Sequence, residues 1–165
     1  MPINEAFLAE LETEARPTRK MLELVPLDKA DWAPHKKSMP LGRLATHVAE
    51  IFGWASTTID TKELDFSKME YKPKIAASNA DLISIFEENL FKAEKSIKNA
   101  SDDVFKEDWT LRDGEKIYMT APKAVVLRSF AFSHLIHHRG QLSVYLRLLD
   151  IPLPGVYGPT ADQPM

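Results

Sequence analysis

Apolar side chains recur at intervals of three or four positions in four stretches of the chain, with charged and polar side chains between them. This period is typical of an amphipathic helix that buries one face. The pattern therefore predicts four long helices, in the ranges 3–25, 38–59, 78–101 and 122–149.

Proline and cap residues indicate where these helices begin and bend. Pro17 has no backbone N–H and crowds the preceding turn, so we expect the first helix to bend or split there. Ser38 is the expected N-cap of the second helix, with Pro40 in the first turn, where a missing N–H costs nothing. Ser78 and Asn79 are candidate caps of the third helix.

The segments outside the helices predict an irregular connection, a β-hairpin and an extended tail. Residues 62–77 are polar and without a sustained period, which indicates an irregular connection long enough to carry function. Residues 108–119 alternate around Asp113-Gly114, a strong hairpin signal. The tail, 151–165, is rich in proline and glycine, so we expect it to be extended and to fold back over the surface. We expect one all-α domain over residues 1–165, with a small β-hairpin insertion.

The last predicted helix, 122–149, has apolar residues over nearly its whole circumference. A helix of this kind must be buried on all sides, and three companion helices offer too little surface for that. Part of the helix is therefore expected to pack against a second subunit, most simply across a two-fold axis. The sequence predicts a homodimer.

Composition excludes several classes of function. The chain has 165 residues and no cysteine, so histidine and carboxylate are the strong metal ligands available to it. A net charge of -3 argues against a nucleic-acid partner, which usually needs a basic face. No stretch is apolar enough to span a membrane, and the first residues lack a signal-peptide pattern, so we expect a cytoplasmic protein.

Three histidines are candidates for a metal site. His134 and His138 lie four residues apart, about 40° from each other on one helical face. His47 lies at the edge of the apolar stripe of the second helix, facing a seam between helices. Three imidazoles around one divalent ion leave a coordination position open for water or substrate. His137, about 60° to the other side of His134, is an alternative ligand, and hydrogen-bonded core histidines account for the same pattern.

The sequence leaves more than one role open for other residues near the three histidines. Gln141 lies about 20° from His134 on the helical wheel, so it is a candidate to support a ligand, to contact substrate, or to satisfy buried backbone groups. Arg139 points away from that face and is expected in a structural ion pair or an interface. Gly140 is expected to allow close helix packing. Glu50 is the only obvious general base, and its helical angle places it off the inner face.

Three segments together resemble a known family. They are the run 134–142, which contains H-x-x-x-H-R-G-Q, the run 44–50 around His47, and Tyr157-Gly158-Pro159 near the end. These segments resemble the DinB (YfiT-like) family of metal-dependent proteins, and the resemblance extends over nearly the whole chain. The most specific part is the motif on the last helix combined with a histidine on the second.

The resemblance implies a fold and a ligand set. The fold is a four-helix bundle of the up-down-down-up type, commonly dimeric. The implied metal is nickel or zinc, held by one histidine from the second helix and two from the last. By motif position these ligands are His47, His134 and His138, and His137 falls outside the motif.

The resemblance also implies a choice of functions. Some members transfer or isomerise small molecules with a low-molecular-weight thiol such as bacillithiol or mycothiol, which the metal activates as a thiolate. We expect either a metal-dependent thiol S-transferase of this kind or a hydrolase that uses metal-bound hydroxide, acting on a small-molecule substrate. The alternative is a non-catalytic homodimer that binds a metal or a small molecule and in which the ion is structural. The catalytic residues are not identified by the sequence.

Overall fold

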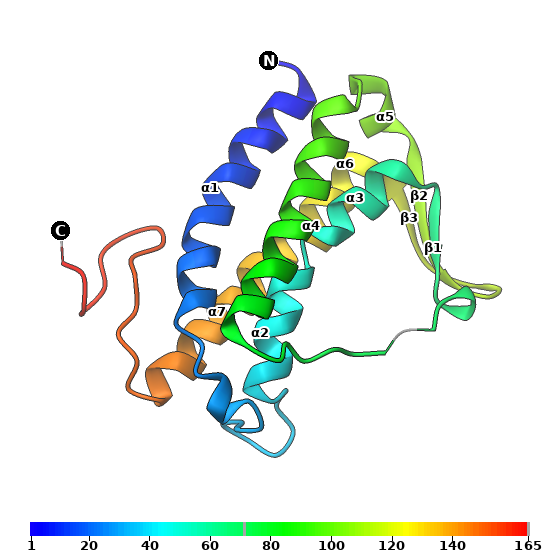
Figure 1. Cartoon of the computed structure of the whole chain (residues 1–165). Helices are drawn as coiled ribbons and strands as arrows, with labels where there is room; N and C mark the ends of the chain where they lie inside the picture. The colour runs from blue at the N-terminus through cyan, green and yellow to red at the C-terminus, as the bar shows by residue number, and fades with distance from the viewer. Residues whose placement is uncertain (71, 165) are drawn as a thin grey trace.

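The computed structural model describes residues 1–70 and 72–164 (Figure 1). Within these residues the protein is mostly helical, with one small three-stranded sheet. The helices are α1 (Ile3–Glu23), α2 (Leu41–Glu50), α3 (Gly53–Asp60), α4 (Asn79–Asn99), α5 (Asp102–Lys106), α6 (Lys123–Val126) and α7 (His134–Leu148). A π-helical stretch, η3 (Leu127–Ser133), joins α6 to α7, and the short 3-10 turns are η1 (Leu27–Lys29) and η2 (Phe66–Lys68).

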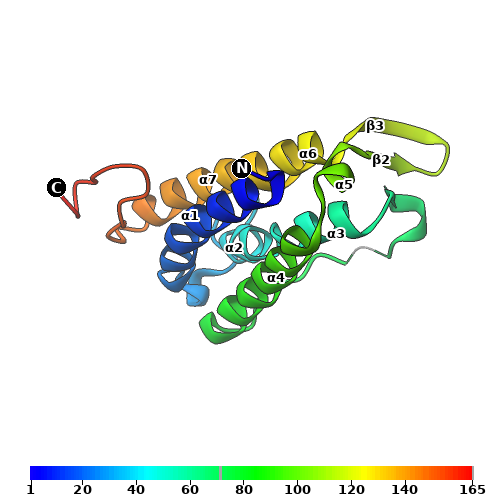
Figure 2. The same ribbon diagram turned by 90° about the horizontal axis from the view of Figure 1, so that it is seen from above.

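The long helices lie side by side around α2 (Figures 1 and 2). The segment formed by α2 and α3 runs in the same direction as α4, whereas α1 and the segment from α6 to α7 run in the opposite direction. Phe52, in the junction between α2 and α3, is fully buried among them. Its ring centroid lies 6.0 Å from that of Phe86 on α4 and 6.3 Å from that of Phe132 on η3. Burying each such ring contributes roughly 1.5–3 kcal/mol, which holds the helices together.

Of the two outcomes predicted at Pro17, a bend or a split, the split does not occur: helix α1 continues to Glu23. Two side chains donate hydrogen bonds to the backbone of the turn that the proline weakens. The Thr18 hydroxyl donates to the Glu14 carbonyl at 2.7 Å, and the Arg139 guanidinium donates to the same carbonyl at 3.1 Å. One contact within α1 and one from α7 therefore stabilise a turn that Pro17 weakens.

The second predicted helix differs from the structure at its start and in its middle. It begins at Leu41 with Pro40 as its N-cap residue, so Ser38 is not the cap. The ring of Pro40 disfavours the helical conformation at the residue before it, and the helix therefore starts after the proline. The chain also forms a tighter junction at residues 51–52, where Trp54 N–H donates to the Ile51 carbonyl at 3.0 Å, three residues back. This junction separates α2 from α3.

The third predicted helix is confirmed and corresponds to α4. Ser78 is its N-cap, and its hydroxyl accepts a hydrogen bond from the Asp81 N–H at 3.1 Å. The helix ends at Asn99, within the expected boundary.

The predicted hairpin is present as β2 (Asp108–Asp113) and β3 (Lys116–Pro122). Gly114 occupies the first central position of its turn with φ 57°, a conformation that only glycine adopts without strain. A third strand, β1 (Glu63–Asp65), pairs in parallel with β2. The predicted irregular segment 62–77 is therefore partly a strand, and the protein is not purely α-helical. The Asp65 carboxylate fixes this pairing, because it accepts hydrogen bonds from the N–H groups of Ser67 and Gly114.

The last predicted helix is helical throughout but changes type in its middle, where η3 widens the turns directly before His134. The expected role of Gly140 is wrong, because a Cβ atom built at this residue meets nothing within 4 Å.

Beyond α7, the tail folds back over the molecule, as expected. The Tyr157 hydroxyl lies 2.8 Å from a carboxylate oxygen of Glu14 on α1. None of the helices in the described ranges combines the length and apolar character needed to cross a membrane.

Candidate metal centre

Helices α2 and α7 bring His47, His134 and His138 together. One ring nitrogen from each histidine lies within 4.8 Å of those from the other two, and each of the three side chains is partly buried. The Nε2 atoms of His47 and His134 are 3.2 Å apart. Two nitrogen ligands bound to a tetrahedral ion at about 2.0–2.1 Å lie about 3.4 Å from each other, so this spacing fits a shared ion.

Hydrogen bonds orient two of the imidazoles. His138 Nδ1 donates to the Gln141 side-chain oxygen at 2.7 Å, and His134 Nδ1 donates to the Phe130 carbonyl at 3.3 Å. Each acceptor is a carbonyl oxygen, so the proton of each neutral ring is on Nδ1. The Nε2 lone pairs are consequently available to an ion, which is the usual arrangement of histidine ligands.

Burial keeps all three imidazoles neutral. The pKa of His47 is lowered to about 4, first by burial and then by the nearby His138, His134 and Arg43 side chains. Burial also lowers the pKa values of His134 and His138. Neutral imidazole is the form that binds a metal, so the site is ready to bind at neutral pH without losing protons.

The structure places His137 outside this group. It is exposed, and although its ring lies 4.8 Å from the His138 ring, it does not belong to the cluster of ligand-capable nitrogens. Of the two alternatives left open by helical spacing, His138 is the one that lies with His47 and His134.

Aromatic side chains pack around Phe130, whose backbone carbonyl contacts His134. Phe130, on the π-helical stretch, supplies the carbonyl that accepts from His134 and packs its ring against Trp54 on α3, with centroids 5.0 Å apart. The same ring lies 6.1 Å from that of Trp109, which is fully buried in β2. The sheet therefore supports the histidine cluster through Phe130, and π-helical turns are frequent at functional sites.

A cavity of about 240 Å³ adjoins His47. We call it the inner cavity, and its lining residues in the described structure are His47, Glu50, Gly53, Trp54, Thr57, Leu64, Met69 and Asn89. Glu50 was expected off the inner face, yet it lines this cavity together with His47. Its carboxylate pairs with Arg43 at 3.1 Å, and Arg43 also donates to the Lys74 carbonyl at 3.3 Å.

The sequence matches the DinB family over residues 1–164. The chain belongs to the DinB family. It is 25% identical over 161 residues to the uncharacterized protein YrdA of Bacillus subtilis (strain 168), covering 95% of this chain and 89% of that protein. The family resemblance inferred from the motifs is thus confirmed.

Solved structures of DinB-like proteins share this fold. A DinB-like protein from Bacillus cereus ATCC 10987 has a TM-score of 0.71 and 20% identity, covering 93% of this chain and 97% of that one. The DinB-like protein YjoA from Bacillus subtilis has a TM-score of 0.69 and 18% identity, covering 95% of this chain and 96% of that one.

Sequence reasoning missed Arg43 and Asn89 near the histidines of this DinB-family protein, and it placed Glu50 off the inner face. Arg43 and Glu50 share one face of α2 with His47, so helical spacing contained a signal for both residues. Asn89 lies on another helix and carried no such signal. It reaches the inner cavity only because Gly53 has no side chain: a Cβ at Gly53 would lie 2.3 Å from Asn89 Oδ1.

Proposed function

We propose that this DinB-family protein binds one divalent metal ion through His47, His134 and His138. The observation that carries the proposal is the convergence of the three imidazoles, two of which have Nδ1–H groups engaged by carbonyl oxygens. The course of the helices supports assigning them to a four-helix bundle of the up-down-down-up type, in which α2 and α7 supply the ligands.

Nickel and zinc are the metals that we propose. Imidazole nitrogen suits both ions, and the chain has no cysteine to favour a softer metal. Three neutral ligands leave the double positive charge uncompensated, so the ion would promote ionisation of a water or thiol bound beside it.

We propose that the site is catalytic and acts on a small molecule, as a thiol S-transferase or a hydrolase. Two observations favour this over a structural ion. In the described chain, the ligand group contains three residues and no fourth, which leaves a coordination position open. The inner cavity adjoins His47, so a small molecule can be held next to that position. In this scheme the histidines hold the ion, and the walls of the cavity orient the substrate and exclude water.

Metal content tests the ligand assignment. The purified protein is expected to contain about one nickel or zinc ion per chain by elemental analysis, and His47→Ala is expected to lose it because two imidazoles bind far more weakly. His137→Ala is the matched control and should keep its metal. Unchanged metal content in His47→Ala would overturn the assignment.

Activity assays test the catalytic role. Metal-loaded protein is incubated with a thiol and monochlorobimane, and separately with activated esters and amides, beside the His138→Ala variant. Turnover that the variant lacks supports the enzyme. If both proteins are equally inactive while the variant has lost its metal, the alternative of a non-catalytic metal-binding protein is favoured.

We also propose that the protein is a homodimer. Three apolar side chains on the segment from α6 to α7 stay exposed in one chain: Val125, Val144 and Leu148 at 53%, 56% and 57%. A second copy of the chain would cover them. Light scattering at micromolar concentration should give the mass of two chains, and the mass of one chain would refute the proposal.

A further inference from the structure

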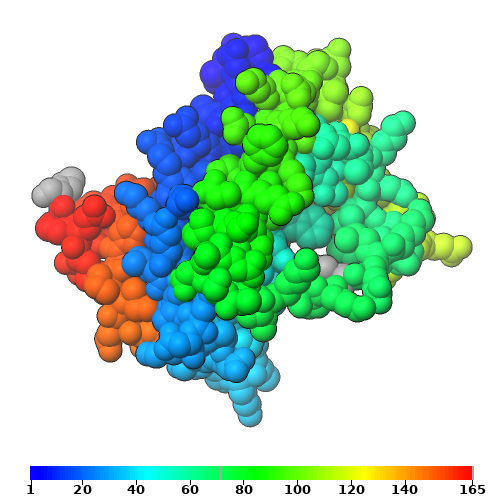
Figure 3. All heavy atoms as spheres, in the orientation of Figure 1, coloured from blue at the N-terminus to red at the C-terminus, as the bar shows by residue number. Residues whose placement is uncertain are grey.

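Two side chains separate the inner cavity from a second cavity of about 250 Å³. We call the second one the outer cavity; its lining residues are Glu50, Lys74, Ile85, Glu88, Asn89 and Lys92. Glu50 and Asn89 line both cavities, so the cavities adjoin at these two side chains, which we call the neck. The surface is open between α4 and the segment that leads into it (Figure 3).

The neck presents hydrogen-bond acceptors. Asn89 Nδ2 donates to the Ile85 carbonyl at 2.8 Å, which fixes the amide and leaves Oδ1 without a hydrogen bond in the described structure. Glu50 uses Oε2 in its pair with Arg43, which leaves Oε1 as a second acceptor. Two acceptor oxygens at one constriction favour a ligand with an N–H group there.

The cavities on either side of the neck differ in chemistry. The inner cavity has an apolar wall formed by Trp54, Leu64 and Met69. The outer cavity carries two lysines, Lys74 and Lys92. Lys92 pairs with Glu88 at 2.6 Å, and both lysines act to lower the pKa of that carboxyl group. The two carboxylates of this cavity each have a cationic partner, Arg43 for Glu50 and Lys92 for Glu88, whereas Lys74 forms no ion pair with a described residue. The positive charge of Lys74 favours an anionic ligand group in the outer cavity.

We infer that the two cavities together bind an N-acylated amino acid with an apolar acyl group. The acyl group occupies the inner cavity, the amide N–H lies at the neck against Asn89 and Glu50, and the carboxylate faces Lys74 and Lys92. The inference rests on the proposed function in assigning the cavity beside His47 to the substrate.

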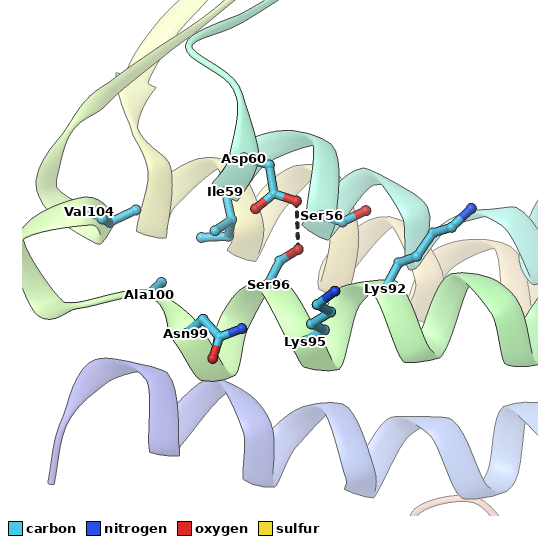
Figure 4. A pocket seen from close by; sticks show the side chains of 9 residues that line it. All are labelled: Ser56, Ile59, Asp60, Lys92, Lys95, Ser96, Asn99, Ala100 and Val104. Carbon is cyan, nitrogen blue, oxygen red and sulfur yellow. Dashed lines mark hydrogen bonds between the residues drawn. The ribbon is translucent and has the colours of Figure 1, made fainter.

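A larger cavity between α3 and α4, of about 480 Å³, does not fit this ligand (Figure 4). Its centre holds the Asp60 carboxylate, which accepts a hydrogen bond from the Ser96 hydroxyl at 2.7 Å. Figure 4 shows these two side chains facing each other, with Lys92 extending away from them. An anionic ligand here would meet the Asp60 carboxylate, which forms no ion pair with a described residue, whereas Glu50 and Glu88 in the outer cavity are each paired with a cation. Asn99, which lines this cavity on the same helix as Asn89, therefore provides a control position.

Four probes test the three parts of the ligand separately. N-benzoylglycine has all of them, its methyl ester lacks the negative charge, benzoyloxyacetate lacks the N–H, and N-acetylglycine lacks the apolar ring. Each is titrated into the isotope-labelled full chain, and the dissociation constant is measured from NMR shifts. N-benzoylglycine should bind most tightly, about fivefold more tightly than benzoyloxyacetate, as expected for one hydrogen bond. Its shifts should centre on the Trp54 indole and the Asn89 amide.

The variant Asn89→Leu removes one acceptor. It should weaken N-benzoylglycine binding about fivefold and reduce the preference over benzoyloxyacetate, because the amide N–H then keeps only the Glu50 carboxylate as an acceptor. Asn99→Leu should leave both affinities unchanged. A variant that merely loosened the fold would weaken all four probes together and would keep the preference.

Three results would overturn the inference: equal affinity for N-benzoylglycine and benzoyloxyacetate in the unchanged protein, an undiminished preference in Asn89→Leu, or shifts centred on Ser96 and Asn99. The metal content of the same samples is measured in parallel. Binding of N-benzoylglycine to protein without metal would leave this inference standing and count against the metal centre. Bound metal without a preference for N-benzoylglycine would leave the metal centre standing and overturn this inference.

Discussion

The Gln141 side chain decides which nitrogen of His138 faces the other imidazoles. Its oxygen accepts from Nδ1 at 2.7 Å, so the Nε2 lone pair of His138 is directed away from that bond. Gln141 itself is exposed, and it therefore acts by orienting His138 and not by filling the core. Of the roles that the sequence left open for Gln141, support of a candidate ligand is the one that this contact favours.

Replacing Gln141 should weaken metal binding without removing a ligand. In Gln141→Leu the His138 ring loses its acceptor and samples both tautomers, so we expect zinc affinity to fall about tenfold. Competition with a chromophoric chelator measures this affinity. Ser143→Ala, which removes a hydroxyl on the same helix, is the control and should bind zinc as the unchanged protein does. Equal affinities for both variants would show that the contact does not orient the ligand.

The pKa of His47 sets the pH range in which metal should be lost. Its folded-state pKa is about 4, below the ordinary value of 6.5, so protons compete with the ion only under acidic conditions. We expect metal to be retained below pH 6.5, where free imidazole already titrates, and to be released as pH approaches about 4 to 5. Chelator-accessible zinc measured against pH tests this. Release centred at 6.5 or above would contradict it.

The same pKa shift affects the stability of the metal-free protein. Between pH 6.5 and about 4 the unfolded chain binds a proton at His47 that the folded chain resists. The contribution of neutral His47 to stability is therefore complete above pH 6.5 and is lost as pH falls through this window. Denaturation with urea at several pH values should show stability decreasing in this direction.

At the scale of elements, sequence periodicity located the long helices but not their irregularities. The cap at Ser78 and the turn at Gly114 were predictable because each residue satisfies a local backbone requirement. The junction at residues 51–52 and the π-helical stretch were not, because both depend on packing between distant helices. Strand β1 was missed because it has only three residues and no alternation to reveal it.

The candidate site was likewise predictable where local spacing determines it and not where tertiary packing does. His134 and His138 are paired by helical spacing, and the apolar stripe of the second helix placed His47 at a seam between helices. The family resemblance then favoured these three together. The inner cavity was not predictable from local pattern. It depends on the junction before Gly53 and on Asn89, which lies 36 residues further along the chain and is positioned by tertiary structure.

Two glycines on these helices should respond to alanine in opposite ways. Gly140→Ala adds a methyl group where nothing lies within 4 Å, so better helix propensity should raise the free energy of unfolding by about 0.5–1 kcal/mol. Gly53→Ala places a methyl group against Asn89 Oδ1 and should break the bond from Asn89 to the Ile85 carbonyl, costing about 0.5–1.5 kcal/mol. Urea denaturation measures both changes, and stabilisation by Gly53→Ala would contradict the close contact described.

At the scale of the whole molecule, a buried ion pair joins the first helix, the last helix and the tail. Arg139 Nη2 lies 2.6 Å from a Glu14 carboxylate oxygen, and both side chains are almost fully buried. The Tyr157 hydroxyl accepts from Arg139 at 2.6 Å and donates to the Glu14 carboxylate. Arg139 has the structural ion-pair role expected from its helical angle, and it directly follows His138 in the chain.

Removing the cation from this pair should destabilise the whole fold. Arg139→Leu leaves the Glu14 carboxylate buried without its partner, and we expect a loss of about 3–5 kcal/mol. Tyr157→Phe keeps the pair and removes only the hydroxyl, so it should cost about 1 kcal/mol. Chemical denaturation compares the two variants. A similar small loss in both would mean that the Glu14 charge is solvated after all.

The distance in sequence between His47 and His134 has a thermodynamic consequence. The two residues are 87 positions apart, and an ion bound to both would close that length of chain into a loop. By analogy with the chain-entropy model of disulfides, a cross-link of this span disfavours the unfolded state by about 4–5 kcal/mol. In a protein without cysteine, a bound ion would thus act as a covalent-like cross-link, even if its principal role were catalytic. A rise in melting temperature on metal binding is therefore expected under both proposals, and only turnover separates them.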